Sequence, residues 1–503
     1  MGPATGLLTA GVAIAVAQLV AAFVGELASP VVAVGEATID LAPPWLKDFA
    51  IREFGAKDKI ALLIGIGVLL AIFAVVMGTL SIRRGWVGYA GLAAFGIIGL
   101  LAAVTRPTRD ALSPLPSILG VFAGGWALRI LLRATSAAPK PAMGNPLAFD
   151  RRRFLVASVA VGGTAVVTGF GSRIASSATS KAAASRASLR IPKPTDIAPL
   201  PSGSGFPVPG LSSFYTPNDS FYRVDTAIIV PKVPAQDWRL RIHGMVDRDT
   251  EMDFRQLTSR PLIERDVTLT CVSNPVGGSY IGNARWIGAP LQPILEEAGI
   301  HQGATQLVSR SADGFTVGTP TAVLLDGRDA MLAVAMNGEP LPLAHGFPVR
   351  MVVPGLYGYV SATKWVVDME LTTFEAYDAY WVQRGWSQQA PIKTQSRIDT
   401  PRHGASAKAG TVPIAGVAWA QHRGIEAVQV SVDGGGWQPA KLAMQDTVDT
   451  WRLWRYDWDA RPGRHILQVR AIDDAGAVQT AQEAPPPPNG ATGWHTIPVT
   501  VRG

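Results

Sequence analysis

Four long apolar stretches in the first third of this 503-residue chain constrain its fold more than any other feature. They cover roughly residues 4–24, 60–80, 86–104 and 115–132. Each is close to the ~20 residues that a helix needs to cross a bilayer, and inside lipid only helices or closed barrels satisfy the backbone groups. The sequence therefore predicts a four-helix transmembrane anchor over residues 1–140.

A fifth apolar run, residues 154–170, follows the segment Asp150-Arg151-Arg152-Arg153-Phe154-Leu155. An arginine pair, one residue, Phe-Leu and a Gly/Ala-rich apolar run are typical of a twin-arginine export signal. We assign residues 141–175 to this signal and a fifth transmembrane helix, which is either cleaved or retained. With these arginines in the cytoplasm, Arg83-Arg84 and Arg133/Lys140 also lie inside by the positive-inside rule, while the 25–59 loop and the catalytic domain lie outside.

The net charge of +7 is concentrated in this apolar third. Residues 1–189 carry 17 Lys and Arg against 8 Asp and Glu, whereas residues 190–503 carry 28 against 30. Basic residues that flank apolar segments indicate membrane topology, while nucleic-acid binding needs a basic face on the folded part. The charge pattern therefore predicts contact with membrane lipid and no nucleic-acid partner.

The histidine and cysteine positions exclude a haem in the expected anchor. None of the seven histidines lies before residue 243, and the single cysteine, Cys271, rules out both a Cys-x-x-Cys-His motif and an intrachain disulfide. Electrons must then be exchanged with a separate carrier, a cytochrome or a quinone-linked protein. The helices serve as an anchor alone, or they recognise a quinone or cytochrome partner directly.

Composition and periodicity divide the chain after residue 175 into a linker and folded domains. Residues 176–210 are rich in Ser, Ala, Pro and Gly and predict a flexible linker. Residues 211–390 mix strand-like alternation at 238–246 with helical spacing at 291–298, where Gly299 is the expected stop, so we expect an α+β domain.

Short alternating runs separated by turn residues fill the C-terminal part. The runs cover residues 412–419, 427–432, 451–458 and 465–472, with Asp433-Gly434 and Pro462-Gly463 as turns. This pattern predicts an immunoglobulin-like β-sandwich over residues 391–503 that lacks an inter-sheet disulfide.

Cys271 follows a β-like run, residues 267–269, and precedes small and polar residues that include Gly277-Gly278. Such residues let a backbone approach a bound group closely, and loops at strand ends commonly hold ligands. A thiolate is a good ligand for a redox metal, while a neutral thiol is usually a small buried hydrophobe. On residue type alone, Cys271 is either a structural cysteine or a ligand or nucleophile.

The wider pattern resembles the sulfite oxidase family of molybdenum-cofactor enzymes from about residue 211 to the C-terminus. The segments that carry this resemblance are Cys271-Val-Ser-Asn274, Gly282-Asn-Ala-Arg-Trp-Ile-Gly-Ala-Pro-Leu291, Met336-Asn-Gly-Glu-Pro-Leu-Pro342, His345-Gly-Phe-Pro-Val-Arg350, Val353-Pro-Gly-Leu-Tyr-Gly358 and Lys364-Trp365. The resemblance implies a mononuclear molybdenum held by one pyranopterin dithiolene and one protein cysteine, for which Cys271 is the candidate. It also implies a homodimer formed through the C-terminal module.

Three residues match family positions that contact the pterin and its phosphate: His345, Arg350 and Lys364. Each has a simpler alternative role. His345 can be a loop histidine with its hydrogen bonds made within the protein, and Arg350 or Lys364 can form an ion pair with Asp368 or Glu370. Three further residues are weaker candidates for the cofactor rim: Tyr222, Asn274 and Asn283. Asp313 is most simply a turn residue before Gly314.

The family resemblance implies oxygen-atom transfer on a small substrate, with Cys271, Arg384 and Trp386 as candidates at the catalytic centre. Sulfite-oxidising members hold their dianion with arginines, but Val224-Asp225-Thr226 and Val276 replace two of these positions and Trp386 replaces a tyrosine. Sulfite is therefore doubtful unless Arg285, Arg384 or Arg423 compensates, although Arg423 can equally be a surface residue. The alternatives are a sulfoxide reductase of the same fold and a non-catalytic membrane-anchored binding or adhesion protein.

Overall fold

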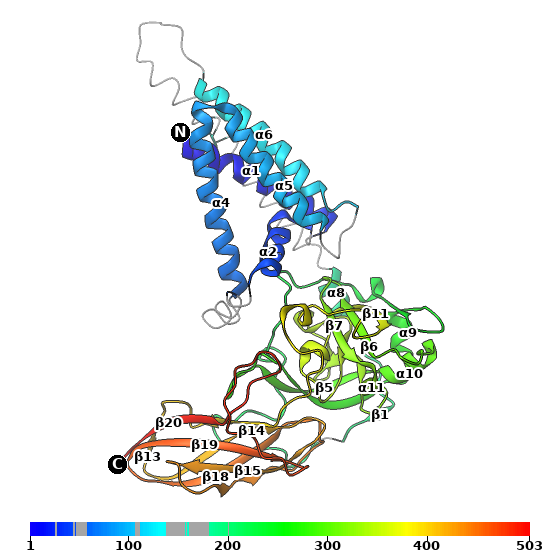
Figure 1. The fold of residues 1–503 in the computed structure, drawn as a ribbon, viewed down its shortest axis with the longest axis vertical. Coiled ribbons are helices and arrows are strands. Elements are labelled where there is room, and N and C mark those ends of the chain that lie inside the picture. The colour runs from blue at the N-terminus through cyan, green and yellow to red at the C-terminus, as the bar shows by residue number, and fades with distance from the viewer. Residues whose placement is uncertain are drawn as a thin grey trace. The chain divides into compact units, whose positions relative to one another are not determined.

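The computed structural model describes residues 1–25, 28–43, 46, 58–105, 111–136, 156, 158–159, 181–199 and 201–503. It divides into two compact units (Figure 1). The first comprises Met1–Ser180 together with Asp225–Val230, and the second comprises Lys181–Val224 together with Pro231–Gly503.

The first unit is helical. Its main helices are α1 (Gly2–Val24), α2 (Pro30–Leu41), α4 (Asp58–Arg83), α5 (Gly85–Val104) and α6 (Leu115–Ser136). All of these except α2 are long and apolar enough to cross a membrane. The prediction of four long apolar helices is confirmed, and α2 lies in what was expected to be a connecting loop.

Glycines let the helices of this unit approach closely. A Cβ on Gly6 of α1 would lie 1.8 Å from the Ala74 carbonyl oxygen of α4, and a Cβ on Gly78 would lie 2.4 Å from the Gly6 nitrogen. Close contact of small residues is the main source of helix association in lipid, where burial of apolar surface gives little. The α1–α4 crossing therefore depends on glycine at these positions.

The expected twin-arginine-like signal and fifth helix, residues 141–175, lie outside the described residues apart from residues 156 and 158–159. By contrast, most of the expected linker is ordered, which corrects its assignment. Residues 181–188 form helix α8 (Lys181–Ser188), and β1 (Asp196–Ile197) pairs with a strand of the second unit. Arg186 donates to the carbonyl oxygens of Leu341 and Pro340, so this segment belongs to the domain that follows it.

Two mixed sheets form the α+β part of the second unit. The first has the order β1-β4-β5-β8-β10, with β4 at Ile263–Thr270, β5 at Ile281–Pro290, β8 at Met331–Met336, β10 at Arg350–Val352, and β9 (Glu339–Pro340) paired to β8. The second has the order β3-β2-β11-β6-β7, with β3 at Thr250–Asp253, β2 at Arg239–Gly244, β11 at Val366–Thr372, β6 at Gln306–Ser311 and β7 at Thr316–Pro320. The α+β prediction is thereby confirmed.

The helices of this part are short. They are α9 (Phe254–Thr258), α10 (Leu291–Ala298) and α11 (Thr321–Leu324). Helix α10 has the predicted bounds, and Gly299 ends it with φ of 73°, a left-handed conformation that favours glycine. Strands β5 and β8 are buried along nearly their whole length, so the first sheet is covered on both faces.

The C-terminal part is a sandwich of two sheets (Figure 1). One has the order β12-β14-β18-β17, with β12 at Gln395–Thr400, β14 at Gly410–Trp419, β18 at Arg452–Ala460 and β17 at Lys441–Leu442. The other has the order β13-β20-β19-β15-β16, with β13 at Ser406–Lys408, β20 at His495–Arg502, β19 at Gly463–Asp473, β15 at Ile425–Val432 and β16 at Gln438–Pro439. The four predicted runs coincide with β14, β15, β18 and β19, and one apolar core joins the two sheets.

Candidate active site

Cys271 lies directly after β4, as its sequence position predicts, and is buried without a disulfide. Its backbone N–H donates to the Tyr280 carbonyl oxygen at 2.9 Å, and its own carbonyl oxygen accepts from the Asn274 N–H at 3.1 Å. These bonds fix the turn that follows β4. The thiol is therefore held at a strand end by backbone geometry, as a ligand residue requires.

The thiol is neutral when no metal binds it. Burial raises the pKa of Cys271, while hydrogen bonds from Ser273 and the charge of Lys364 act in the opposite direction. A metal that binds this sulfur must displace its proton, so the nearby lysine charge and the Ser273 donors favour the ligating form.

Arg350 is a buried cation that faces no carboxylate among the described residues. It is 5% exposed, and burial lowers its pKa to about 10. Its Nη1 donates to the His345 carbonyl oxygen at 3.1 Å, its guanidinium carbon lies 4.9 Å from the Trp286 ring centroid, and its Nε has no hydrogen-bond partner in the described part of the chain. A buried charge with an orphaned donor is costly unless an anion completes it.

Two further basic residues, His345 and Lys364, lie around Arg350. His345 is 6% exposed and its Nε2 lies 3.2 Å from the Asn218 carbonyl oxygen. Burial and the charges of Arg350 and Lys364 lower the pKa of His345 to about 4, so its ring is neutral at pH 7. Lys364 donates to the Val224 carbonyl oxygen at 3.2 Å. The three residues that the resemblance joins are thus one electropositive cluster.

The expected alternative partners of these cations are engaged elsewhere. Asp368 contacts His243 at 3.0 Å and Arg310 at 3.1 Å, and Glu370 contacts Arg310 at 2.5 Å. The interpretation of Arg350 as an ion-pair partner of Asp368 or Glu370 is therefore wrong.

The weaker candidates fall in different places. Tyr222 lies close enough to Cys271 and Arg350 for both to affect its pKa, which burial raises. Asn274 accepts from the Tyr280 N–H at 2.8 Å and so shapes the turn after Cys271. Asn283 is fully buried, and its amide is engaged by other residues: it donates to the Phe214 carbonyl oxygen at 3.0 Å and accepts from Thr268 at 2.9 Å.

The glycines after Cys271 lie close to neighbouring protein atoms. A Cβ on Gly277 would lie 2.2 Å from the His495 ring, and a Cβ on Gly278 would lie 2.5 Å from Asn274 Oδ1. The close approach inferred from Gly277-Gly278 is therefore to the sandwich and to the turn itself. Asp313 accepts from the Phe315 N–H at 3.3 Å, which supports its interpretation as a turn residue.

Tyr357 lies near enough to Cys271 to be affected by its charge, and it was not singled out from the sequence, although it stands in the quoted segment 353–358. It is 3% exposed, and burial, with a smaller contribution from Cys271, raises its pKa to about 12. Its hydroxyl accepts a long hydrogen bond from the Lys393 N–H at 3.5 Å. A neutral phenol beside the thiol is thus available to donate a hydrogen bond.

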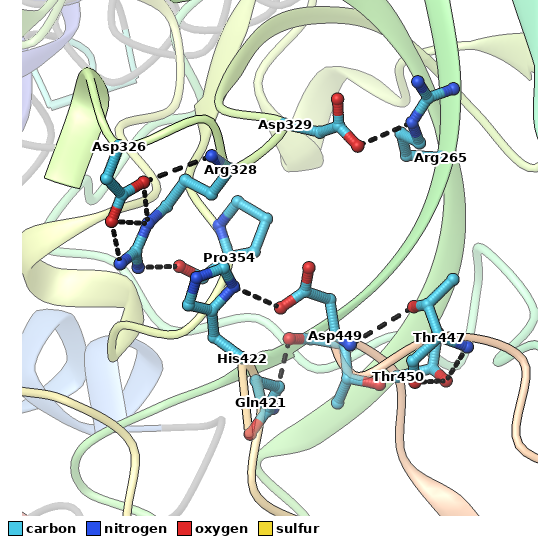
Figure 2. Close-up of polar contacts among 11 residues, drawn as sticks. Arg265, Asp326, Arg328, Asp329, Pro354, Gln421, His422, Thr447, Asp449 and Thr450 are labelled. Carbon is cyan, nitrogen blue, oxygen red and sulfur yellow. Dashed lines mark hydrogen bonds and ion pairs between the residues drawn. The ribbon is translucent and has the colours of Figure 1, made fainter. Parts of the chain in front are cut away.

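The loop that carries this phenol is bound by Arg328 at Pro354 (Figure 2) and lies close to His422 of the sandwich at Gly355. Arg328 Nη1 donates to the Pro354 carbonyl oxygen at 2.7 Å, and His422, in the turn after β14, lies 3.3 Å from Asp449. Gly355 has φ of 86°, and a Cβ there would lie 2.8 Å from the His422 Cβ and 2.9 Å from Arg328 Nη1. Only glycine fits this junction, so the position of the loop depends on contacts between the two domains.

Gly490→Ala is expected to displace Tyr357. Gly490 has φ of 100°, and an added Cβ would lie 2.5 Å from the Tyr357 hydroxyl. Gly434→Ala is a matched control, since Gly434 also has positive φ, 70°, but no atom within 4 Å of an added Cβ. Both variants carry left-handed strain of about 1 kcal/mol, and overpacking adds about 1–3 kcal/mol at Gly490 alone. A drop in Tm of equal size in both variants would contradict this account.

Aromatic rings surround the two remaining candidates, Arg384 and Trp386. Trp386 contacts Tyr359 and Trp381, with ring centroids 5.9 and 6.2 Å apart. Arg384 lies over the Tyr380 ring at 3.5 Å from its centroid and donates to the Tyr380 carbonyl oxygen at 2.7 Å. Both candidates therefore belong to an aromatic cluster in the same loop region.

Two other arginines are engaged in ion pairs. Arg285 binds Asp266 through Nε at 2.8 Å and Nη2 at 2.7 Å, in the register that pairs these residues across β4 and β5. Arg423 contacts Asp473 at 3.0 Å and donates to the Ile392 carbonyl oxygen at 3.0 Å. The expectation that Arg285 can replace a substrate-binding arginine is wrong, because its guanidinium neutralises a fully buried carboxylate.

Asp446 forms a carboxyl pair with this buried Asp266. Its Oδ2 is buried and has no donor among the described residues, and Tyr215 also donates to Asp266 at 2.8 Å. Burial and the charge of Asp266 raise the pKa of Asp446 to about 7, against the opposing charge of Arg285. Protonated Asp446 can donate to Asp266, so the pair shares one proton between the two domains.

We expect the protein to lose stability as the pH rises through 7. The folded pKa of Asp446 lies above its ordinary 3.8, so stabilisation by this proton is complete below about pH 4 and is lost above pH 7. Asp446→Asn removes this titration, and the measurement is Tm from pH 5 to 8.5. His465, whose pKa is raised by Asp433, changes stability in the same direction, so the difference between wild type and Asp446→Asn is the readout. Parallel Tm curves would reject the shared proton.

The residues around Cys271 fit a metal carried by an anionic organic cofactor. Within the described residues no three His, Cys, Asp or Glu side chains gather as metal ligands, so further ligands must come from a non-protein group. The orphaned Nε of Arg350, with His345 and Lys364 beside it, suits a phosphate. The donor set thus agrees with one thiolate ligand and one bound anion.

Comparison with known proteins agrees with this site. A family model described as an oxidoreductase molybdopterin binding domain matches residues 227–381. Sulfite oxidase of Gallus gallus is 30% identical over 321 residues, which covers 54% of this chain and 69% of that protein. Mitochondrial sulfite oxidase of Homo sapiens is 31% identical over 322 residues, which covers 54% of this chain but only 58% of that protein.

A solved structure shares the fold. The crystal structure of the sulfane dehydrogenase SoxCD from Paracoccus pantotrophus superposes with a TM-score of 0.50 at 25% identity, and the match covers 57% of this chain and 82% of that one. The present chain therefore spans somewhat more than half the length of the mammalian relatives and most of this structural neighbour.

Proposed function

Because this chain belongs to the sulfite oxidase family of molybdopterin-dependent oxidoreductases, we propose that it is a membrane-anchored enzyme that transfers an oxygen atom to or from a small sulfur compound. Electrons are exchanged with a separate carrier. Four apolar helices support the anchor, and the twin-arginine-like segment supports a catalytic domain on the outer side of the cytoplasmic membrane.

The observation that carries this proposal is Arg350. Arg350 is 5% exposed, its Nε has no partner, and no carboxylate lies opposite it among the described residues. A bound anion would offset the free-energy cost of burying this cation. In a non-catalytic binding protein such a site would be a pure cost in stability.

Different residues of the chain would bind the cofactor, donate a hydrogen bond near the metal ligand and exclude water. Cys271 would hold the metal through its sulfur, and Arg350, with His345 and Lys364, would bind the phosphate of the pterin. The bound molybdenum centre would supply the two-electron oxygen-atom transfer. Tyr357 would donate a hydrogen bond near the thiolate, and Trp386 with Tyr359 would exclude water at the rim.

The rim favours a neutral substrate over sulfite. Val276 and Val224 stand where sulfite-oxidising relatives are expected to carry arginines, and Arg285 and Arg423 are engaged by carboxylates. The loss of two charge-assisted hydrogen bonds weakens sulfite binding by about 3–6 kcal/mol, which corresponds to about 10²–10⁴-fold in affinity. A sulfoxide is therefore the alternative substrate within the same reaction class.

The test is turnover by the full-length protein, with sulfite and ferricyanide in one assay and dimethyl sulfoxide and reduced benzyl viologen in the other. We expect weak, poorly saturating activity with sulfite. Val276→Arg is expected to improve kcat/KM for sulfite by about tenfold or more and to leave sulfoxide turnover unchanged, because one cation contributes about 1.5–3 kcal/mol to binding an anion. No gain with sulfite would reject this account of specificity.

Elemental analysis separates the enzyme from a binding protein. About one molybdenum per chain in exported protein is the expected result, together with a pterin in the extract. A chain without metal or pterin would favour the membrane-anchored binding or adhesion protein. We also propose that the sandwich is immunoglobulin-like and forms a homodimer, which the mass in solution tests.

A further inference from the structure

The connection between β19 and β20 is longer than its position in the sheet requires. These strands are antiparallel neighbours, which need only about 2–5 residues between them, whereas residues 474–494 separate the two (Figure 1). The connection contains four consecutive prolines, residues 485–488, which fix φ and leave the chain few conformations. We call residues 484–493 the proline loop. Long connections within compact domains are commonly functional, so the contacts of this loop are informative.

The proline loop lies against the Tyr357 phenol. A Cβ on Gly490 would lie 2.5 Å from the Tyr357 hydroxyl oxygen. Tyr357 is near enough to Cys271 for the charge of that sulfur to affect its pKa. The next residue, Gly358, approaches the end of β4, because a Cβ there would lie 3.7 Å from the Thr270 carbonyl oxygen. Tyr357 therefore connects the proline loop to the strand end that precedes Cys271.

Two other segments that carry candidate site residues also contact the proline loop. The Ser387 N–H, directly after Trp386, donates to the Pro488 carbonyl oxygen at 3.0 Å. A Cβ on Gly493 would lie 3.7 Å from a methyl of Val276, the position where sulfite-oxidising relatives are expected to carry an arginine. One loop of the sandwich thus lies beside three separate segments of the candidate active site.

Lys393 holds the part of the proline loop that contacts Tyr357. Its Nζ donates to Asn489 Oδ1 at 2.8 Å and to the Gly490 carbonyl oxygen at 2.6 Å. Its backbone N–H donates to the Tyr357 hydroxyl at 3.5 Å. Hydrogen bonds from a charged donor are stronger than those between neutral groups. Lys393 therefore bonds to both members of the contact between Gly490 and Tyr357.

We propose that the proline loop forms one wall of the active site and that Lys393 is a positioning residue, which holds this loop against Tyr357 near Cys271. The inference rests on the function proposed above. Tyr357 is buried beneath Gly490, so an outward shift of the proline loop frees the phenol and opens a path toward the thiol. The sandwich thereby shapes the surroundings of the proposed metal ligand.

The test uses Cys271, the single cysteine of the chain, as a reporter in full-length protein produced without the cofactor. A buried thiol reacts with iodoacetamide only when the structure opens locally, so the alkylation rate measures how firmly Cys271 is covered. We expect Lys393→Met to raise this rate by about tenfold or more, as for the loss of one charge-assisted hydrogen bond. Lys393→Arg retains the charge and the donors and should stay near the wild-type rate.

Arg452→Met is the matched control. Arg452 is also a half-buried cation, and it donates to the Ile425 carbonyl oxygen at 2.6 Å and to the Ala443 carbonyl oxygen at 2.9 Å, both outside the proline loop. Its loss should lower Tm and leave the alkylation rate unchanged. Gly490→Ala, which displaces Tyr357 directly, should raise the alkylation rate as Lys393→Met does, and it gives a second reading.

An unchanged alkylation rate in Lys393→Met and Gly490→Ala would overturn the proposal. An equal rise in Arg452→Met would also overturn it, because the effect would then be general loosening of the sandwich. A rise in Lys393→Arg as large as in Lys393→Met would likewise reject the role of the charge. Alkylation is read without molybdenum, so a chain that binds no metal would reject the proposed function and leave this test readable.

Discussion

Arg350→Met is expected to lower cofactor affinity by about 10²–10⁴-fold and yet to leave the cofactor-free protein as stable as wild type or more stable. Arg350 is 5% exposed, its Nε has no partner, and no described carboxylate neutralises it. Methionine fills a similar volume without charge, so folding no longer buries an unpaired cation. Binding loses a bidentate, charge-assisted contact of about 3–6 kcal/mol. The measurements are Tm of the cofactor-free chain and pterin content after purification.

Arg350→Met is thus expected to weaken cofactor binding without lowering the stability of the cofactor-free chain. Arg310→Met is the matched control, for which we expect the reverse. Arg310 is a partly buried arginine of the neighbouring sheet that binds Asp368 at 3.1 Å and Glu370 at 2.5 Å. Its removal leaves Glu370 without this cation and Asp368 with His243 alone, so Tm should fall while pterin content per folded chain stays constant. If Arg350→Met instead lowered Tm as Arg310→Met does, Arg350 would be a structural residue and the proposed anion site would be rejected.

Cys271→Ser is expected to abolish oxygen-atom transfer, with a loss of well over 100-fold. Changes to groups that merely orient a metal ligand cost about 10–100-fold, and here the proposed ligand itself is replaced by a harder, weakly acidic hydroxyl. Serine is nearly isosteric, and the backbone bonds that hold the turn, Cys271 N–H to Tyr280 and Asn274 N–H to Cys271, are retained. Tm of the cofactor-free chain should therefore match wild type.

X-ray absorption at the molybdenum edge separates ligand loss from misfolding. With the proposed dithiolene and Cys271 thiolate as ligands, the wild type is expected to show three sulfur neighbours, and Cys271→Ser should show two or lose the metal altogether. If the variant kept the same number of sulfur neighbours and full activity, Cys271 would be a buried structural cysteine and not a metal ligand.

Local signals in the sequence determined the four long helices, helix α10 and several strands of the sandwich. Runs of about 20 apolar residues define the four long helices, because backbone groups in lipid must bond within their own segment. Gly299 ends α10 as predicted, since the left-handed residue after a helix is usually glycine. Alternation and turn pairs likewise located β14, β15, β18 and β19. In each case the governing interaction lies within a few residues along the chain.

Composition alone misassigned residues 181–210. Their Ser, Ala and Pro content indicated a tether, but Arg186 and β1 bond to segments about 65–155 residues away and hold the stretch in place. A segment with few large apolar residues can still be ordered when its polar groups find distant partners. Such partners leave no pattern in the local sequence.

The roles of individual polar residues were decided by the tertiary structure. Arg285 and Asn283 occupy a matching segment of the sequence, yet Arg285 neutralises Asp266 across β4 and β5, and Asn283 bonds Phe214 and Thr268. Gly277 makes room for His495 of the sandwich, and Tyr357 is held beside Cys271 by a junction between domains. The sequence by itself determined which residue types are present and which local elements form. Only the fold decided which charges are already neutralised and which, like Arg350, face no carboxylate among the described residues, because pairing depends on distance in space.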